Sequence, residues 1–460
     1  MRFIALFIFF SLSACVNYAG IHTHSHTTPE EQFAAPKRPD VAWWQHFHDD
    51  HLTHYIETGL SQSPTIQIAA SRIDLARAKS GAAGSALWPS INANTQIQRE
   101  RISANTIYPP PYGGNTYTET NLGLNFQYEL DFWGKNREAL AAKISEESVA
   151  ITEKESAELM LSTTIAAAYV ELQAETAGLQ LKQNLLNVEQ ELLQILQTRV
   201  TRGVESDIPL DTAEANVESV KLELAALTEK IKSSQNEIAA LLGQNAFDTV
   251  IVAAPFRYEK QAVALPTNIP LNLLGRKPEI IAARTRIEVA AHNVNVAKSR
   301  FYPNINLLGL LSLQSYTLGQ ALNPGSRDNI LGLALDLPIF DANERRAQLT
   351  GQYAEYDMAV AEYHQSLIIG LRDVSNAENR LKQLEIQEIS EANLLKSKAN
   401  KAKLQRVLYQ HGISDYAHVL EARANLLIEQ DHQLQLQATH YQTALALIKA
   451  VAGNYQGIKE

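Results

Sequence analysis

Side chains suited to chemistry are few and scattered in this chain of 460 residues. An enzyme needs titratable residues that converge in one pocket, or a metal or phosphate site at recognisable spacing. The sequence contains no Ser-His-Asp spacing and no metal-ligand cluster, and Gly81-Ala82-Ala83-Gly84 lacks the flanking lysine of a phosphate-binding loop. We therefore predict no enzyme, no catalytic residue and no cofactor.

A histidine-rich tract near the N-terminus is the strongest candidate for metal chemistry. It contains His22, His24 and His26, and four further histidines lie between residues 46 and 54. Such tracts bind metals, but the same composition is typical of a polar linker that leads into a surface helix. We interpret it as a linker and predict no metal site, and metal binding stays open as the alternative.

The only cysteine, Cys15, excludes an intrachain disulfide. It follows an apolar run, Phe3–Leu12, which is too short to cross a bilayer but is typical of a signal-peptide core. Leu12-Ser13-Ala14-Cys15 resembles the lipobox of bacterial lipoproteins, which implies a signal peptide over residues 1–14 and a lipid on the Cys15 thiol. Val16 in the next position favours outer-membrane sorting by the same resemblance. The alternative is an ordinary secretory signal.

Composition and charge argue against a nucleic-acid partner and against a transmembrane helix. The formal net charge of −10 and the pI near 5.8 argue against nucleic acid, which needs a basic face. No segment after the signal peptide reaches about 18 uninterrupted apolar residues, so no transmembrane helix is predicted. Residues 15–40 are rich in threonine, histidine and proline, which predicts a lipidated, extended tether.

An internal repeat with a period near 210 residues determines the expected fold. Leu87–Asn92 (LWPSIN) recurs as Phe301–Asn306 (FYPNIN), and Leu124–Arg137 recurs as Leu333–Arg346. Each half predicts the order helix, strand, loop, strand, long helix, tight turn, helix. The predicted division is a first repeat over residues 41–250, a linker over 251–280 and a second repeat over 281–460.

Alternation of apolar and polar residues predicts four strands whose two faces meet different solvents. Leu122, Leu124 and Phe126 alternate with Asn121 and Asn125, for example. Strands of about ten to twelve residues suit a tilted transmembrane β-strand, and four of them are too few to close a barrel alone. The predicted strands cover residues 90–102, 118–132, 303–316 and 328–340.

The helical segments contain an unusually long one. Residues 138–201 include no proline and a single glycine, which predicts a continuous helix roughly 95 Å long. Its apolar positions repeat every seven residues in two seams, one through Ile165 and Leu172 and one through Met160 and Ala167, on nearly opposite sides. Such a helix packs against neighbours on both sides, so we predict a wall of helices that curves into a tube. The predicted helical hairpins cover residues 135–243 and 341–453.

Several motifs on these elements resemble those of TolC-type outer-membrane factors, most closely the NodT-like lipoprotein branch. They lie between about Trp43 and Tyr455, and departures at Lys277 and Glu279 from the family's Leu-Leu-x-Arg-Arg-Pro-Asp-Ile signature keep the charge. Pro278 with Glu279 is typical of a first helical turn, so we interpret that motif as structural. The motifs are Trp43-Trp44-x-x-Phe47, Tyr128–Lys135 (YELDFWGK), Leu273–Ile280 (LLGRKPEI) and Phe301-Tyr302-Pro303.

The resemblance implies a mixed α and β membrane protein. Three protomers would each give four strands to a twelve-stranded β-barrel, continued by a long periplasmic α-helical barrel. The homotrimer would lie in the outer membrane, in contact with its lipid, and would conduct drugs or other toxic small molecules passively. Its implied partners are a periplasmic adaptor (a membrane fusion protein) and an inner-membrane RND-type pump. A periplasmic coiled-coil scaffold without a pore, or a protein-secretion duct of the same fold, stays open.

Two turns between long helices are the expected functional tips. Glycine after one helix, and serine or aspartate before the next, is ordinary capping chemistry. The resemblance implies in addition that the turns meet the adaptor, through Gly203, Ser206, Asp207, Gly412 and Ser414.

The resemblance also places a ring of acidic residues just after the second tip, where it narrows the pore. Here Leu420-Glu421-Ala422-Arg423 occupies that stretch. Three copies of Glu421 near a threefold axis would repel one another and attract cations. The expected gate residues are therefore Glu421, Asp415 and Ala417, and a solvated helix face is the alternative.

Overall fold

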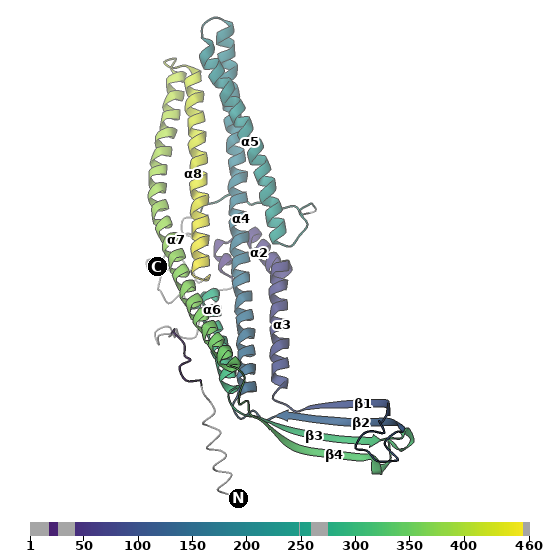
Figure 1. Ribbon diagram of the computed structural model, residues 1–460. Helices are drawn as coiled ribbons and strands as arrows, with labels where there is room; N and C mark the ends of the chain where they lie inside the picture. Colours follow the sequence, from purple (N-terminus) through teal and green to yellow (C-terminus); the bar gives the residue numbers. More distant parts are fainter. Residues whose placement is uncertain (1–17, 26–41, 248, 259–274, 454–460) are drawn as a thin grey trace. The chain divides into compact units, whose positions relative to one another are not determined.

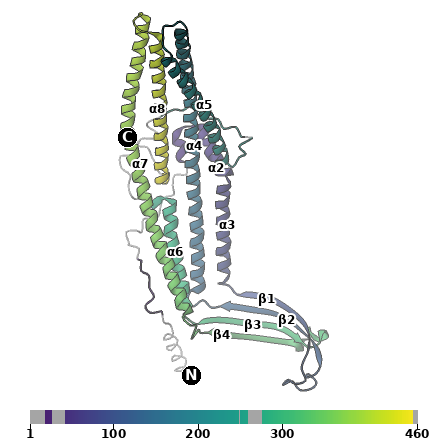
Figure 2. The ribbon, with the colours of Figure 1, turned by 45° about the horizontal axis from the view of Figure 1, so that its top comes forward.

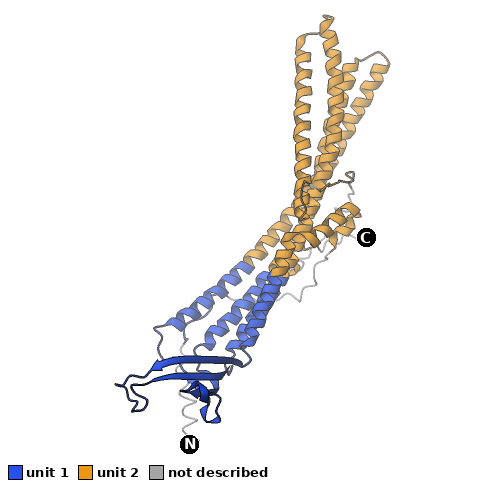
Figure 3. Cartoon of the chain, turned by 90° about the vertical axis from the view of Figure 1, so that its right-hand side faces the viewer, with its two compact units in different colours: residues 1–29, 72–151, 282–363 blue, residues 30–71, 152–281, 364–460 orange. Residues whose placement is uncertain are grey.

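The computed structural model describes residues 18–25, 42–247, 249–258 and 275–453, which form two compact units (Figures 1 and 3). Unit 1 comprises residues 1–29, 72–151 and 282–363, and unit 2 comprises residues 30–71, 152–281 and 364–460. The expected signal peptide, Cys15 and most of the tether lie outside the described residues.

The element order repeats once along the chain, so the predicted internal repeat is confirmed. Two short helices, η3 (Trp43–Phe47) and α2 (Asp50–Gln62), precede the first repeat. The first repeat is α3 (Pro64–Ser85), β1 (Ser90–Arg101), β2 (Thr116–Glu129), α4 (Lys135–Thr201) and α5 (Asp207–Leu241). The second is α6 (Pro278–Ser299), β3 (Asn304–Ser315), β4 (Arg327–Asp336), α7 (Glu344–Gln410) and α8 (Tyr416–Ala450), with η6 (Leu318–Gln320) and η7 (Pro324–Ser326) between β3 and β4.

Of the helices that the structure describes, none combines the length and the apolar composition that crossing a membrane requires.

Unit 1 contains an antiparallel sheet with the strand order β1-β2-β3-β4. Leu124 pairs with Ala93 on one side and with Leu311 on the other, so apolar side chains continue across one face. On the opposite face the Glu119 carboxylate accepts from the amides of Gln98 and Gln314 at 2.7 and 2.8 Å. The alternation thus gives the sheet one apolar and one polar face, as the sequence predicts.

The second and fourth strands end three or four residues before the predicted positions 132 and 340. β4 stops at Asp336 because Pro338, two residues later, has no N–H to donate to a ladder. After β2 the chain turns to start α4, where the Asp131 carboxylate accepts from the backbone N–H groups of Asn136 and Arg137 at 3.1 and 2.9 Å. Helix capping therefore replaces strand pairing at this point.

The core of unit 2 packs η3 and α2 against α4, α5 and α8. Ile56 of α2, Ile165 of α4 and Ile238 of α5 are fully buried in it. The Trp43 indole donates to Ser162 Oγ at 3.2 Å. The two-tryptophan motif therefore anchors the first described residues of unit 2 in this core.

Nearer the hairpin turns, α4 lies between α5 and α8 (Figure 2). Leu185, Val188 and Leu192 of α4 form an apolar cluster with Val220 of α5 and Leu420 of α8. The prediction that this helix has neighbours on both sides is therefore confirmed for this stretch. One seam residue, Met160, is an exception because it is half exposed.

Gly59 in α2 marks a close approach to α4, since a Cβ there would lie 2.5 Å from the Cδ1 of buried Ile165. We expect Gly59→Ala to lower the thermal unfolding midpoint of the detergent-solubilised protein, measured by circular dichroism. Overpacking costs about 1–3 kcal/mol, which outweighs the roughly 1 kcal/mol by which a helix favours alanine over glycine. Gly81→Ala in α3, where nothing lies within 4 Å, is the control and should raise the midpoint. A higher midpoint for both variants would contradict the packing of α2 on α4.

Candidate functional site

Both hairpins of unit 2 end in tight turns, one between α4 and α5 and one between α7 and α8 (Figure 2). Gly203 and Gly412 have φ of +71° and +72°, a backbone conformation that favours glycine. The N–H groups of Gly203 and Val204 donate to carbonyls of the last turn of α4 at 2.8 and 3.0 Å, and those of Gly412 and Ile413 donate likewise at 2.9 Å in α7. Both glycines therefore end their helices in the way their spacing predicts.

Of the two serines, Ser206 occupies the N-cap position of α5 and Ser414 precedes the N-cap residue of α8 by one position, and neither side chain caps the helix that follows. Ser206 makes no side-chain cap hydrogen bond to α5, and the Ser414 hydroxyl donates instead to Gln405 Oε1 at 3.0 Å. Asp415 caps α8, because it directly precedes the first helical residue and its carboxylate accepts from Ala417 N at 3.1 Å. Asp207 is the first residue of α5, where its negative charge faces the positive end of the helix dipole.

Asp415 also ties α8 to α4. Its carboxylate forms a short ion pair with the Arg199 guanidinium in the last turn of α4, and this hydrogen bond holds the pKa of Asp415 below its ordinary value. One residue on, the Tyr416 hydroxyl donates to Glu191 Oε1 at 3.0 Å. We call these two contacts, Arg199–Asp415 and Glu191–Tyr416, the tip clamp. The sequence did not reveal Arg199 or Glu191, because each lies more than 200 residues from its partner.

Glu421 lies on the exposed face of α8. Its backbone carbonyl accepts a hydrogen bond from Asn425 Nδ2, one turn later in α8, at 2.8 Å. This contact does not involve the carboxylate, which is left to face solvent. Behind it, Glu189 of α4 is almost fully buried, and burial together with the charge of Glu421 raises the pKa of Glu189, although a hydrogen bond from Asn216 acts against them. The exposed carboxylate of this stretch is therefore that of Glu421, whereas the environment of Glu189 disfavours its charged form.

Ala417, the third residue expected at the gate, does not share that exposed face in the described protomer. It is 7% exposed and packs with Leu420 and Ala424 in the cluster of α4, α5 and α8. Positions 417, 420 and 424 recur at helical spacing on the side toward the core, whereas 418, 421 and 425 lie on the exposed side.

Another cluster of titratable groups lies in unit 2, away from the tips. The Tyr258 hydroxyl donates to the Glu388 carboxylate, and His440 Nδ1 lies 2.7 Å from the same oxygen. Burial, and next the hydrogen bond to Glu388, raise the pKa of Tyr258, which makes its phenol a poor nucleophile. The cluster fastens residues 249–258 to α7 and α8. Within the described residues, no group of three or more His, Cys, Asp or Glu is arranged to hold a metal ion.

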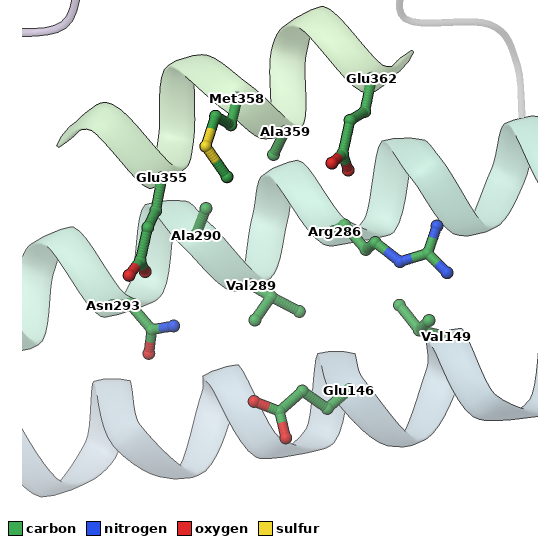
Figure 4. Close-up of a pocket in the computed structure, with 10 residues that line it drawn as sticks. All are labelled: Glu146, Val149, Arg286, Val289, Ala290, Asn293, Glu355, Met358, Ala359 and Glu362. Carbon is green, nitrogen blue, oxygen red and sulfur yellow. The ribbon is translucent and has the colours of Figure 1, made fainter. Parts of the chain in front are cut away.

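An open groove of about 270 Å³ lies in unit 1 between α4, α6 and α7 (Figure 4). Its floor is apolar, and its rim carries Glu146, Glu355 and Glu362 with one opposing cation, Arg286. Lys143 pairs with Glu146 at 2.7 Å, so Glu355 and Glu362 together with Arg286 leave the rim only a small excess of negative charge.

Comparisons with known proteins agree on one family. The family model described as Outer membrane efflux protein matches residues 55–244 and 269–453. The multidrug resistance outer membrane protein MdtP of Escherichia coli is 27% identical over 448 residues, which cover 94% of this chain and 92% of that protein. The crystal structure of the outer membrane protein VceC from Vibrio cholerae superposes with a TM-score of 0.80 at 30% identity, covering 91% of this chain and 100% of that one. That of the Campylobacter jejuni CmeC outer membrane channel gives 0.85 at 20% identity, covering 95% and 96%.

These findings confirm the predicted fold class and function. The protein is a trimeric efflux channel with a β-barrel and a helical barrel. It spans the outer membrane and extends into the periplasm. The family is one of channels and not of enzymes. With its two matched halves and the four strands of its described residues, this protein belongs to the outer membrane efflux protein family.

Proposed function

We propose that the protein is the lipid-anchored exit duct of a tripartite pump that exports drugs or other toxic small molecules. The observation that carries the proposal is the apolar character of the hairpin tips. Val204, Ile208 and Ile413 are 71–76% exposed at the two turns of the described protomer. Exposed apolar side chains gathered at one place mark a protein contact. The relatives MdtP and MdtQ, which are named for multidrug resistance, support the substrate class.

The partner at the tips is a periplasmic adaptor in this proposal. Gly203 and Gly412 shape the two turns, and Ser206, Asp207 and Ser414 place polar groups beside the exposed apolar residues. An apolar centre with a polar rim is the usual anatomy of a protein interface. The adaptor would connect the channel to an inner-membrane RND-type pump, which supplies the energy that a passive conduit lacks.

In this proposal the three residues expected at the gate have different roles: Glu421 lines the pore, and Asp415 and Ala417 support α8. Glu421 carries the free carboxylates, three of which would surround the axis of the trimer. Asp415 acts behind them, because its ion pair with Arg199 holds the start of α8 against α4. Ala417 supports α8 from the core side and does not line the pore.

The proposal also includes a lipid on Cys15, a residue that lies outside the described residues. Its support is the sequence Leu12-Ser13-Ala14-Cys15 after a signal-peptide core.

The proposed duct can be tested in a strain that lacks the gene for this chain, by measuring intracellular accumulation of ethidium. We expect the wild-type chain to lower accumulation. A Val204→Asp and Ile413→Asp double variant should restore it to the level of the deletion, because charged residues at the tips disrupt an apolar contact. Val250→Asp, at a position that is 82% exposed but distant in sequence from both turns, is the matched control and should behave as wild type. A tip variant that still clears the dye at the wild-type rate, at equal trimer abundance, would count against the adaptor contact.

The role of Glu421 predicts a change in ion selectivity. We expect Glu421→Gln to lower the cation-to-anion permeability ratio of single channels in a planar bilayer several-fold, because three negative charges leave the constriction. Glu214→Gln, which removes a carboxylate from an exposed position of α5, should leave the ratio unchanged. An unaltered ratio in Glu421→Gln would exclude this residue from the gate.

The tip clamp predicts a pH dependence of the resting conductance. Because the pKa of Asp415 is lowered from 3.8, its ion pair is intact above that pH and is lost as the pH falls through the lowered value. We expect the conductance to rise only below pH 3.8, as the pH falls through the lowered pKa, since α8 is then released from α4. Asp415→Asn keeps a helix-capping side chain but no ion pair, so it should conduct more at neutral pH and show no acid step. The same acid step in Asp415→Asn would assign it to other carboxylates.

A further inference from the structure

The short described segment near the N-terminus, residues 18–25, is bound to α7 through a single carboxylate. Asp357 of α7 accepts hydrogen bonds from the Thr23 hydroxyl, from His24 N at 3.1 Å and from Ser25 N at 3.0 Å. Three donors from consecutive residues on one carboxylate make a specific charge-assisted contact. We call Asp357 with Thr23, His24 and Ser25 the N-terminal clasp.

Apolar contacts fasten the same segment a few residues earlier. Tyr18 and Ile21 pack on a cluster formed by α6, the residue Phe301 that follows it, and α7. The rings of Tyr18 and Phe301 meet edge to face with centroids 5.5 Å apart, and Arg346 Nη2 donates to the carbonyl of Ala19 at 3.2 Å. The segment is therefore held at both ends within unit 1.

The charge state of Asp357 is consistent with this contact. Burial alone would raise the pKa of Asp357, but the hydrogen bonds from Thr23, His24 and Ser25 outweigh it and lower the pKa. The carboxylate that binds the segment is therefore ionised at neutral pH.

The segment is held beside the helix-side end of the β-sheet. Tyr302 stacks on Trp133 with ring centroids 4.6 Å apart, and the Trp133 indole donates to the carbonyl of Pro303 at 2.8 Å, directly before β3. Exposed aromatic residues recur near the same ends of the other strands, at Trp88, Phe132 and Phe340. Aromatic girdles of this kind mark the level of the membrane interface in barrel proteins.

The distance from this girdle to Cys15 is limited by the chain itself. Cys15 precedes Tyr18 by three residues, which span at most about 11 Å when fully extended. Without the contacts of residues 18–25, the next described residue is residue 42, and the 27 residues between it and Cys15 span at most about 97 Å. The clasp thus reduces the reach of the anchor several-fold.

We propose that residues 18–25 are a docking element that confines the lipid of Cys15 to the aromatic girdle, and that Asp357 is its positioning residue. The inference rests on the proposed lipidation of Cys15. A lipid held at the rim of the sheet enters the membrane beside the strands that must insert, so the clasp favours assembly of the trimer in the membrane.

The clasp can be tested by hydrogen–deuterium exchange on the full-length mature trimer in detergent, followed by mass spectrometry of the N-terminal peptides. We expect the amides of His24 and Ser25 to be protected in the wild type, and to exchange at least tenfold faster in Asp357→Asn. Glu355→Gln, an exposed carboxylate two residues away on α7, should leave that protection unchanged. Exchange of the wild-type amides at the rate of an unstructured peptide would overturn the clasp, whatever the variants do.

A double-mutant cycle with Cys15→Ala tests the link to the lipid. We expect Asp357→Asn to lower the yield of heat-stable trimers in outer-membrane fractions several-fold in the lipidated chain, and to have little further effect in Cys15→Ala. Equal losses in both backgrounds would show that Asp357 only stabilises the fold, which would overturn the positioning role. The mass of the N-terminal peptide reports lipidation separately. An unmodified Cys15 would refute the lipid anchor and the positioning role with it, while the exchange experiment would still decide whether the clasp exists.

Discussion

Backbone groups at the edge of a sheet need hydrogen-bond partners, and lipid offers none. In the described protomer β1 and β4 each pair on one side only, so both outer edges of the four-stranded sheet are open. The apolar face that includes Leu124 and Leu311 would also lack a suitable solvent outside a membrane. Trimeric closure satisfies both demands, because β4 of one protomer can pair with β1 of the next while the apolar face meets lipid. The amide and carboxylate ladder of Gln98, Glu119 and Gln314 then lies on the face away from the lipid.

The helical part also needs neighbours, but there the groups that must be covered are apolar side chains and not backbone N–H and C=O groups. Near the tips, α4 buries Leu185 and Val188 against both α5 and α8, so no single hairpin can cover its apolar surface. Two hairpins and the repeated element order provide the lateral neighbours that the seven-residue pattern requires. At the tips the pattern stops, and the exposed Val204, Ile208 and Ile413 are apolar residues without cover in the described protomer. Their position is the reason that we place a protein partner there.

Carboxylates serve two physical purposes in this molecule. Asp415, Asp357 and Glu388 each accept hydrogen bonds from partners distant in sequence, and they fasten α8, the N-terminal segment and the 249–258 segment respectively. Glu421 is exposed instead, and its charge affects the surrounding solution and the buried Glu189. A fastened carboxylate contributes to structure, whereas an exposed one can act on a passing ion. This difference separates Asp415 from Glu421 although both stand near the same turn.

The sequence by itself determined the repeat, the four alternating strands, the long proline-free helix and the glycine turns, because these depend on local periodicity and on backbone conformation. Gly203 and Gly412, for instance, are recognisable from their own neighbours alone. Only the tertiary structure decided that Ala417 faces the core, that Asp415 pairs with Arg199, and that Asp357 holds Thr23, His24 and Ser25. The reason is that Arg199 and Asp415, or Asp357 and Thr23, meet across more than 200 residues. Spacing along the chain carries no signal for such contacts, which arise when helices from different repeats and the N-terminal segment pack side by side.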